Sequence, residues 1–254
     1  MDSAFVDYVK KSVTFFFDQD TSNEEVVTPF GTGFFVGVNC EKDPTKGQGY
    51  LVSAKHVLQD SNGNFRKDVL IRLNLNGGGS QLLKIPLDRR RIFIHDDPIV
   101  DLVVYPMNPD MNLFDYSLIL PQYFGTQELL KRDEISEGDD VFFAGLFESH
   151  FGFQQNHPIL RFGKIALMSN EKIAFKERHS GSISLADLYL IECMSFAGNS
   201  GSPVFFYLSP TRRSNELVLG SPQMYLAGII KGGFHHTDIL ATDTFLEQNV
   251  VSQQ

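Results

Sequence analysis

The segment from Phe196 to Val204 contains the residue types that nucleophilic attack on a carbonyl group requires. It reads Phe-Ala-Gly-Asn-Ser-Gly-Ser-Pro-Val and presents the hydroxyl group of Ser200 in a turn between two apolar runs. Because Gly198 and Gly201 lack a Cβ atom, the backbone can adopt positive φ and direct successive N–H groups into one concavity. Such a concavity can stabilise the oxyanion of an acyl-transfer reaction. The same residue types are common in ordinary turns, so the chemistry requires partners elsewhere.

A serine hydroxyl group becomes a good nucleophile when a base removes its proton and an acid orients that base. The sequence offers His56 as the base, at the end of the apolar run 49–54. Asp101 follows 45 residues later and is the candidate acid, and Ser200 lies a further 99 residues along the chain. The base and the acid would then belong to the first half of the fold and the nucleophile to the second, with catalysis in the cleft between them.

Two other carboxylates, those of Asp96 and Asp97, compete with Asp101 for the role of the acid. Asp101 is preferred because the apolar run 102–105 follows it directly and would bury it, whereas Pro98 places the other two in a turn. The remaining histidines are expected on the surface or in loops, and they show no zinc-like spacing, so neither a metal nor a cofactor is expected. They are His95, His150, His157, His179, His235 and His236.

Short apolar or alternating runs between turn residues dominate the chain and predict an all-β sandwich or a pair of barrels. The segment 106–125 is rich in Pro, Asn and Asp and marks the boundary between two lobes, at about 11–115 and 126–243, of a single domain spanning 1–254. Short helices are expected at 3–10 and 244–250. Strands are expected at 12–17, 31–38, 49–54, 69–75, 82–87, 91–94, 101–105, 140–146, 159–168, 172–175, 189–193, 204–207, 224–230 and 239–242.

The composition excludes several classes of function. A formal net charge of −9 disfavours nucleic acid or an anionic membrane as the main partner. No apolar run approaches the roughly 18 residues of a membrane-spanning helix. The start of the chain does not resemble a secretory signal, and the chain contains only two cysteines, Cys40 and Cys193, so a cytoplasmic location with reduced thiols is expected.

Four segments in chain order resemble the trypsin-like serine peptidases of the chymotrypsin fold, over about residues 20–245. They are Gly31-Thr-Gly-Phe-Phe-Val36, Leu51-Val-Ser-Ala-Lys-His-Val57, Val100-Asp-Leu-Val-Val104 and Gly198-Asn-Ser-Gly-Ser-Pro203. The similarity is to bacterial-type members of the family. It implies two six-stranded antiparallel β-barrels packed against each other, with a catalytic triad of His56, Asp101 and Ser200.

The resemblance also implies roles for the individual groups. His56 would take the proton of Ser200 as it attacks a peptide carbonyl group and return it to the leaving amine, while Asp101 holds the imidazole. The backbone N–H groups of Gly198 and Ser200 would form the oxyanion hole. The substrate-binding residues would be Met194 and Ser195, at the floor of the first specificity pocket, and Lys231, Gly232 and Gly233, at the strand edge that pairs with the substrate backbone.

Asn199 departs from the pattern of the digestive members, which carry an aspartate that pairs with a new N-terminus after zymogen cleavage. An asparagine has no charge for that pair, so we expect activity to be controlled by a regulatory protein partner or by loop order. The main expectation is a serine endopeptidase of restricted specificity that acts on a protein or peptide. The alternatives are a protease-like binding module without turnover and a β-rich structural protein with accidental motifs.

Overall fold

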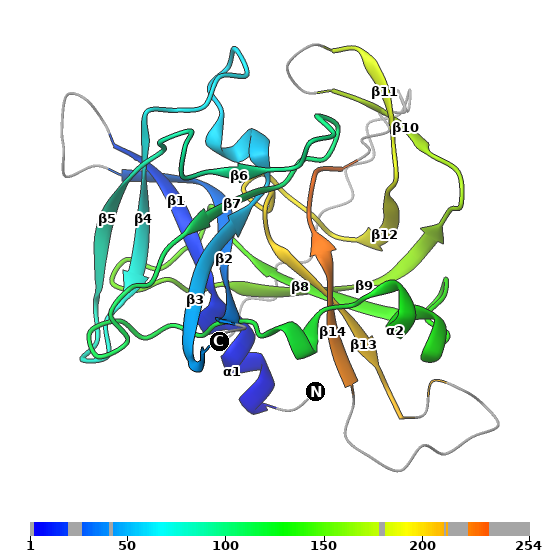
Figure 1. Cartoon of the computed structure of the whole chain (residues 1–254), viewed down its shortest axis with the longest axis horizontal. Coiled ribbons are helices and arrows are strands. Elements are labelled where there is room, and N and C mark those ends of the chain that lie inside the picture. Colours follow the sequence, from blue (N-terminus) through cyan, green and yellow to red (C-terminus); the bar gives the residue numbers. More distant parts are fainter. Residues whose placement is uncertain are drawn as a thin grey trace, which may run out of the picture.

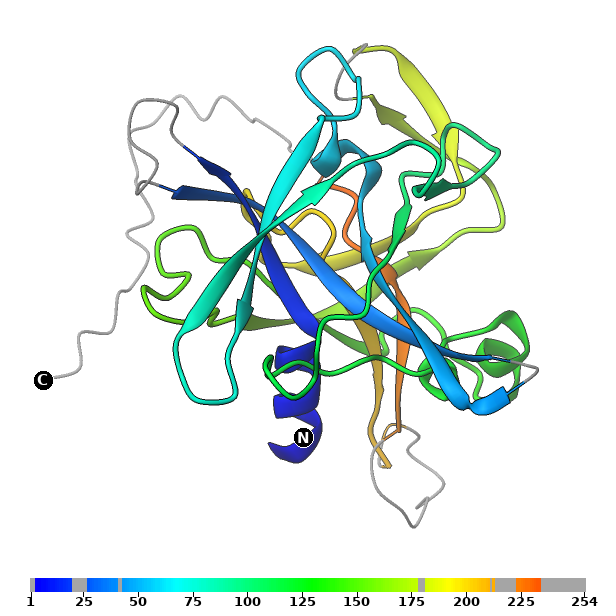
Figure 2. The same cartoon turned by 60° about the vertical axis from the view of Figure 1, so that its left-hand side comes forward.

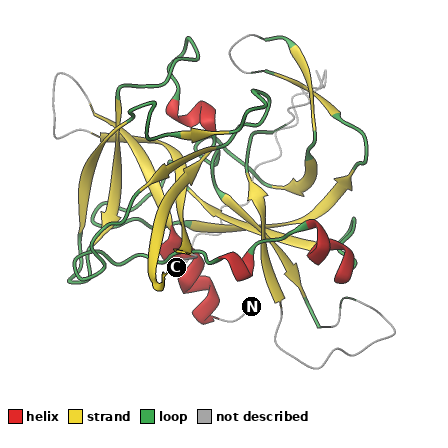
Figure 3. Ribbon diagram, viewed as in Figure 1, coloured by secondary structure: helices red, strands yellow, loops and turns green. Residues whose placement is uncertain are grey.

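The computed structural model describes residues 3–19, 27–40, 43–177, 181–210, 212 and 223–233. Antiparallel strands are the main regular structure in this part of the chain, and helices are short and few (Figures 1 and 3). The predicted all-β class with a chymotrypsin-like arrangement is confirmed: one sheet is built from the first half of the chain and another from the second half. Among the described residues, no helix has the length and apolar character needed to cross a membrane.

The first sheet contains seven strands in the order β5-β4-β1-β2-β3-β7-β6. Side chains from six of these strands meet in one buried cluster, which includes Phe16, Phe35, Leu51, Ile71 and Val103. A flat sheet cannot bring both of its ends to one core, so the sheet must curl around this cluster. Figure 2 shows the strands of this sheet from a second direction. The strands are β1 (Val13–Gln19), β2 (Val27–Cys40), β3 (Asp43–Ser53), β4 (Asp68–Asn74), β5 (Ser80–Pro86), β6 (Phe93–Ile94) and β7 (Val103–Pro106).

The second sheet contains five described strands in the order β12-β9-β8-β13-β14, and its core includes Val141, Phe143, Ile165, Val204 and Phe206. A separate hairpin, β10-β11, projects beside it (Figure 1). The strands are β8 (Asp140–Gly145), β9 (Ile159–Met168), β10 (Ile173–Lys176), β11 (Ile183–Ala186), β12 (Tyr189–Cys193), β13 (Pro203–Leu208) and β14 (Gln223–Ile229).

A third apolar cluster joins the two lobes. Phe34 of β2 and Val52 of β3 belong to the same cluster as Phe142 of β8 and Phe205 of β13, and the last two rings stack 5.2 Å apart. The successive phenylalanines of β1 contribute to two clusters. Phe16 lies in the core of the first sheet, while Phe15 and Phe17 belong to the interlobe cluster. Alternation along a strand sends neighbouring side chains to opposite faces, so the apolar run builds two cores at once.

Most of the expected strands are present with ends shifted by a few residues, and the expected N-terminal helix is α1 (Ser3–Ser12). The sequence did not predict the strand β11 or three short helices. The helices are η1 (Lys55–Leu58), η2 (Pro121–Tyr123) and α2 (Gln127–Arg132). The expected strand 239–242 and helix 244–250 lie outside the described residues.

A buried arginine fastens the loop after β8 to the first lobe. Arg72 of β4 is 5% exposed and lies between the rings of Phe17 and Phe151. Its guanidinium donates to Oδ1 of Asn156 at 2.8 Å and to the carbonyl oxygens of Phe151 and Gly152 at 3.0 and 2.9 Å. Burial lowers the pKa of Arg72 to about 10, so the group remains a cation at neutral pH.

We expect Arg72→Met to lower the free energy of unfolding by about 2–4 kcal/mol, because it leaves several carbonyl oxygens without a donor. Arg90→Met is the matched control, because the Arg90 side chain is 90% exposed and its loss should cost less than about 0.5 kcal/mol. Urea denaturation with an unchanged m-value measures both. Equal midpoints for the two variants would refute this role of Arg72.

Candidate active site

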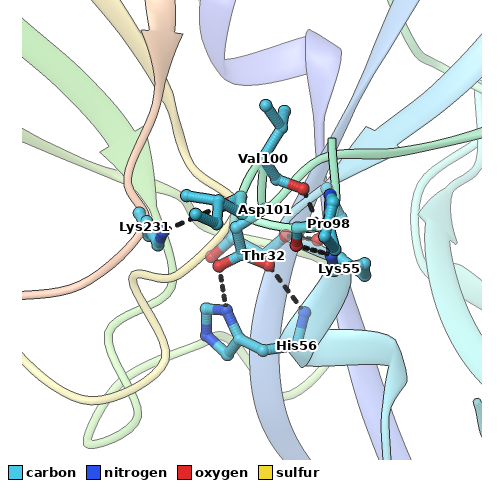
Figure 4. A network of polar contacts seen from close by, with 9 residues as sticks. Thr32, Lys55, His56, Pro98, Val100, Asp101 and Lys231 are labelled. Atoms are coloured by element: carbon cyan, nitrogen blue, oxygen red, sulfur yellow. Dashed lines mark hydrogen bonds and ion pairs between the residues drawn. The ribbon is translucent and has the colours of Figure 1, made fainter. Parts of the chain in front are cut away.

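The imidazole of His56 and the carboxylate of Asp101 form a two-point contact. Nδ1 of His56 lies 2.5 Å from Oδ2 of Asp101, and the His56 backbone N–H donates to Oδ1 at 2.9 Å (Figure 4). The local cause is the start of η1, whose first N–H groups have no partner within the helix. Asp101 accepts them, since the N–H of Lys55 also donates to its backbone oxygen at 3.3 Å. The end of β3 and the start of β7 therefore hold base and acid together.

The electrostatics of Asp101 favour its ionised form. Burial alone would raise the pKa of this carboxyl group, but the hydrogen bonds and charge of His56, with the nearby ammonium of Lys231, outweigh burial and hold the pKa below its ordinary value. The side chains of His56 and Asp101 are 10% and 11% exposed, so water screens their interaction only weakly. A carboxylate in this state fixes the imidazole tautomer and can stabilise an imidazolium.

The competing carboxylate of Asp97 is used within its own turn. Its Oδ1 accepts from the N–H of Ile99 at 2.9 Å, and its N–H donates to Nδ1 of His95 at 3.0 Å. His150 and His157 are exposed and stack on each other with ring centroids 6.4 Å apart. His179, His235 and His236 lie outside the described residues.

The turn of residues 195–202, called here the Ser200 turn, has the backbone that its glycines predict. Gly198 and Gly201 adopt φ values of +84° and +85°. The N–H of Gly201 donates to Ile230 at 2.8 Å, and the N–H of Ser202 donates to Asn199 at 3.0 Å. Among the described residues, no acceptor pairs with the N–H groups of Gly198 and Ser200. These are the two donors that the resemblance assigns to an oxyanion hole.

The Ser200 turn packs directly on the segment that leads to His56. A Cβ atom on Gly201 would lie 2.1 Å from the carbonyl oxygen of Thr32 and 2.4 Å from Oγ of Ser53. Gly31 of β2 lies equally close to the residue after His56, since a Cβ atom on Gly31 would lie 2.5 Å from Cγ1 of Val57. Within the described part of the chain, no hydrogen bond joins the His56 ring to Oγ of Ser200. Such bonds are often long before substrate binds.

Asn199 holds the Ser200 turn by hydrogen bonds within the chain. The residue is 1% exposed, and its Nδ2 donates to the carbonyl oxygen of Leu146 at 2.5 Å. Its Oδ1 accepts from the N–H of Phe196 at 3.1 Å and lies 3.5 Å from Oγ of Ser195. The neutral amide of Asn199 thus holds the turn through hydrogen bonds within the chain.

The residues expected to bind substrate lie at two places near the turn. Met194 and Ser195 follow β12 and are exposed, Met194 by 60%. Gly232 and Gly233 are exposed beyond the end of β14. Lys231 reaches across to the first lobe, where its Nζ donates to the carbonyl oxygen of Ile99 at 3.1 Å. The same Nζ lies 3.6 Å from the centroid of the Phe175 ring.

Two residues with close contacts to the Ser200 turn were not among the sequence candidates. Thr32 donates from Oγ1 to the carbonyl oxygen of Gly198 at 2.8 Å. Arg161 places its guanidinium 4.5 Å from the centroid of the Phe196 ring and 5.7 Å from that of Phe147. No feature of the sequence indicated the hydroxyl contact of Thr32 or the position of Arg161.

Comparison with known proteins finds similar chains among solved structures only. No family model matches the chain, and no curated protein matches it. Among solved structures, the chain is similar to the apo form of the MamO protease domain from Magnetospirillum magneticum, with 14% identity and a TM-score of 0.47. The alignment covers 78% of this chain and 79% of that chain.

Gly201→Ala should destabilise the protein by more than about 4 kcal/mol or prevent folding, because the new methyl group would overlap Thr32 and Ser53. Gly138→Ala is the matched control, since Gly138 also has positive φ, at +90°, but a Cβ atom there meets nothing within 4 Å. Backbone strain alone should cost the control about 1–2 kcal/mol. Thermal unfolding compares the two, and similar losses would contradict the close approach at Gly201.

The lowered pKa of Asp101 predicts a pH-dependent contribution to stability. Ionised Asp101 stabilises the folded state at pH above its unfolded pKa of about 3.9, and this contribution is lost as pH falls through the lower folded pKa. The unfolding free energy of the wild type minus that of Asp101→Asn should therefore decrease below about pH 4. Denaturant titrations from pH 7 downward measure this difference. A difference independent of pH would contradict the ionised pair.

Proposed function

We propose that this protein is a serine endopeptidase in which Ser200 is the nucleophile, His56 the general base and Asp101 the acid that orients it. The observation that carries the proposal is the His56–Asp101 contact of 2.5 Å, in a buried position beside a turn with two N–H groups that have no acceptor among the described residues. A histidine held at both its ring and its backbone by one carboxylate is preorganised to accept a proton. Surface histidines have no need of such a contact.

In the reaction, His56 takes the proton of Ser200 as Oγ attacks the carbonyl carbon of the scissile peptide bond. The N–H groups of Gly198 and Ser200 donate to the resulting oxyanion, and Asp101 stabilises the imidazolium. His56 then returns the proton to the leaving amine, and a water molecule repeats the sequence on the acyl-enzyme. The exposed backbone at Gly232 and Gly233 is proposed to pair with the peptide substrate, and Met194 to favour an apolar side chain before the cleaved bond.

Control by a regulatory partner or by loop order, expected from the sequence, stays a prediction. The internal hydrogen bonds of Asn199 support a turn that is assembled in the isolated chain. We therefore expect activity without cleavage of the chain. Labelling that appears only after a second protein is added would instead support partner control.

A second candidate function is a protease-like module that binds a peptide without cleaving it. Two observations favour it: the described residues show no hydrogen bond from the His56 ring to Ser200, and the ammonium of Lys231 bridges to Ile99 across the two lobes. In such a module the cleft would bind a chain segment while Ser200 remained unreactive. The two candidates differ in the reactivity of one hydroxyl group.

A fluorophosphonate probe, read by intact mass and peptide mapping, separates the two. A single adduct on Ser200 is expected, and its rate should fall by a factor of about 1,000 or more in His56→Ala and vanish in Ser200→Ala. Ser80→Ala is the matched control: this serine also follows a glycine turn, but its hydroxyl group donates to Gln154. If the correctly folded wild type forms no adduct, with or without added partners, the endopeptidase is refuted and the binding module is the function that remains.

A further inference from the structure

Thr32 of β2 connects the Ser200 turn to the first lobe through its backbone and its side chain. The residue is fully buried. Its N–H donates to the carbonyl oxygen of Ser200 at 3.0 Å, and its Oγ1 donates to that of Gly198 at 2.8 Å. The same Oγ1 accepts from the N–H of Leu146 at 3.1 Å, and its own carbonyl oxygen accepts from Oγ of Ser53 at 2.8 Å. One residue thus contacts the turn, the end of β8 and the end of β3.

These contacts hold alternate peptide planes of the turn. The plane between Gly198 and Asn199 is bound at its carbonyl by Thr32 Oγ1 and at its N–H by the oxygen of Phe196, at 3.2 Å. The plane between Ser200 and Gly201 is bound at its carbonyl by the Thr32 N–H and at its N–H by Ile230. Peptide planes are rigid, so fixing one plane restricts its neighbours.

The planes that lie before Gly198 and before Ser200 carry the two N–H groups for which the described part of the chain offers no acceptor. Each adjoins a plane that Thr32 holds, so the directions of both N–H groups depend on that residue. The side chain of Thr32 has a defined geometry because a β-branched residue is restricted at χ1. A valine at this position would fill the same space but would leave the carbonyl oxygen of Gly198 and the N–H of Leu146 without their shared partner.

We propose that Thr32 is a positioning residue of the oxyanion hole, whose hydroxyl group fixes the direction of the Gly198 and Ser200 N–H groups from the opposite lobe. The proposal rests on the proposed function for its kinetic consequence. The orientation of the two backbone N–H groups by Thr32 does not depend on whether the protein turns over a substrate. A residue that acted only by filling space would be replaced without loss by valine.

The test compares Thr32→Val with Thr32→Ser. The rate of fluorophosphonate labelling, or kcat with a cleaved peptide, should fall about 10- to 100-fold in Thr32→Val with KM unchanged, which is less than the loss of an oxyanion donor itself. Thr32→Ser restores the hydroxyl group and should recover the rate to within a few-fold of the wild type. A fall in Thr32→Val that serine does not rescue would overturn the proposal.

Thr14→Val is the matched control for stability. Thr14 is also fully buried, and its Oγ1 donates to the carbonyl oxygen of Arg72 at 2.7 Å, away from the Ser200 turn. This variant should lose similar stability in urea denaturation and keep the wild-type rate. Equal labelling rates in Thr32→Val and Thr14→Val would show that Thr32 has no positioning role.

If the wild type does not react, the proposed function fails, and the amide signals of Gly198 and Ser200 still decide the role of Thr32. In two-dimensional NMR spectra, both signals should shift or broaden in Thr32→Val and stay in place in Thr14→Val. Unchanged signals in Thr32→Val would overturn the proposal whether or not the protein is an enzyme.

Discussion

The close approach of two backbones at Gly201 is the constraint on which the rest of the site depends. The Ser200 turn belongs to the second lobe, yet it lies against Thr32 and Ser53 of the first lobe with no space for a side chain between them. The interlobe cluster supports this approach, because it places Phe34 and Val52 of the first sheet in one buried core with Phe142 and Phe205 of the second. Interior packing is dense and resists small displacements, so the core restricts how far the backbones of the site can move relative to each other.

The two halves of the site are held by different kinds of interaction. His56 and Asp101 come from one sheet and are joined by charge and hydrogen bonds in a poorly screened position. The Ser200 turn is held by neutral hydrogen bonds from Thr32 and Asn199. The charges that act on Asp101 are those of His56 and of Lys231.

Much of the fold could be predicted because short runs with alternating polarity mark strands and the intervening glycines, prolines and asparagines mark turns. The β11 strand was missed because Ile183-Ser-Leu-Ala186 is only four residues long and ends without a β-branched residue. The helix α2 was missed for a similar reason, since six residues with a threonine cap leave almost no periodicity to detect. Local patterns report local structure, and both elements depend on packing that the pattern does not contain.

The candidate site was predictable to the extent that its residue types have specialised chemistry. Histidine, aspartate and a glycine-flanked serine stand out in a sequence, and a resemblance supplied their grouping. The preference for Asp101 over Asp97 followed from the apolar run after it, and in the structure Asp101 contacts His56. The contacts of Thr32 and Lys231 could not be predicted, because they join residues 166 and 132 positions apart through the geometry of two packed lobes.

The neutral anchor provided by Asn199 has a consequence for how the protein can be joined to others. A turn that depends on an ion pair with a free α-amino group is sensitive to anything attached at that end and to the titration of the amine near pH 8. Here the amide of Asn199 bonds to groups of its own chain, at Leu146, Phe196 and Ser195. A fusion partner placed ahead of α1 therefore leaves the Ser200 turn intact, and the protein can be displayed or tethered by that end with its site assembled.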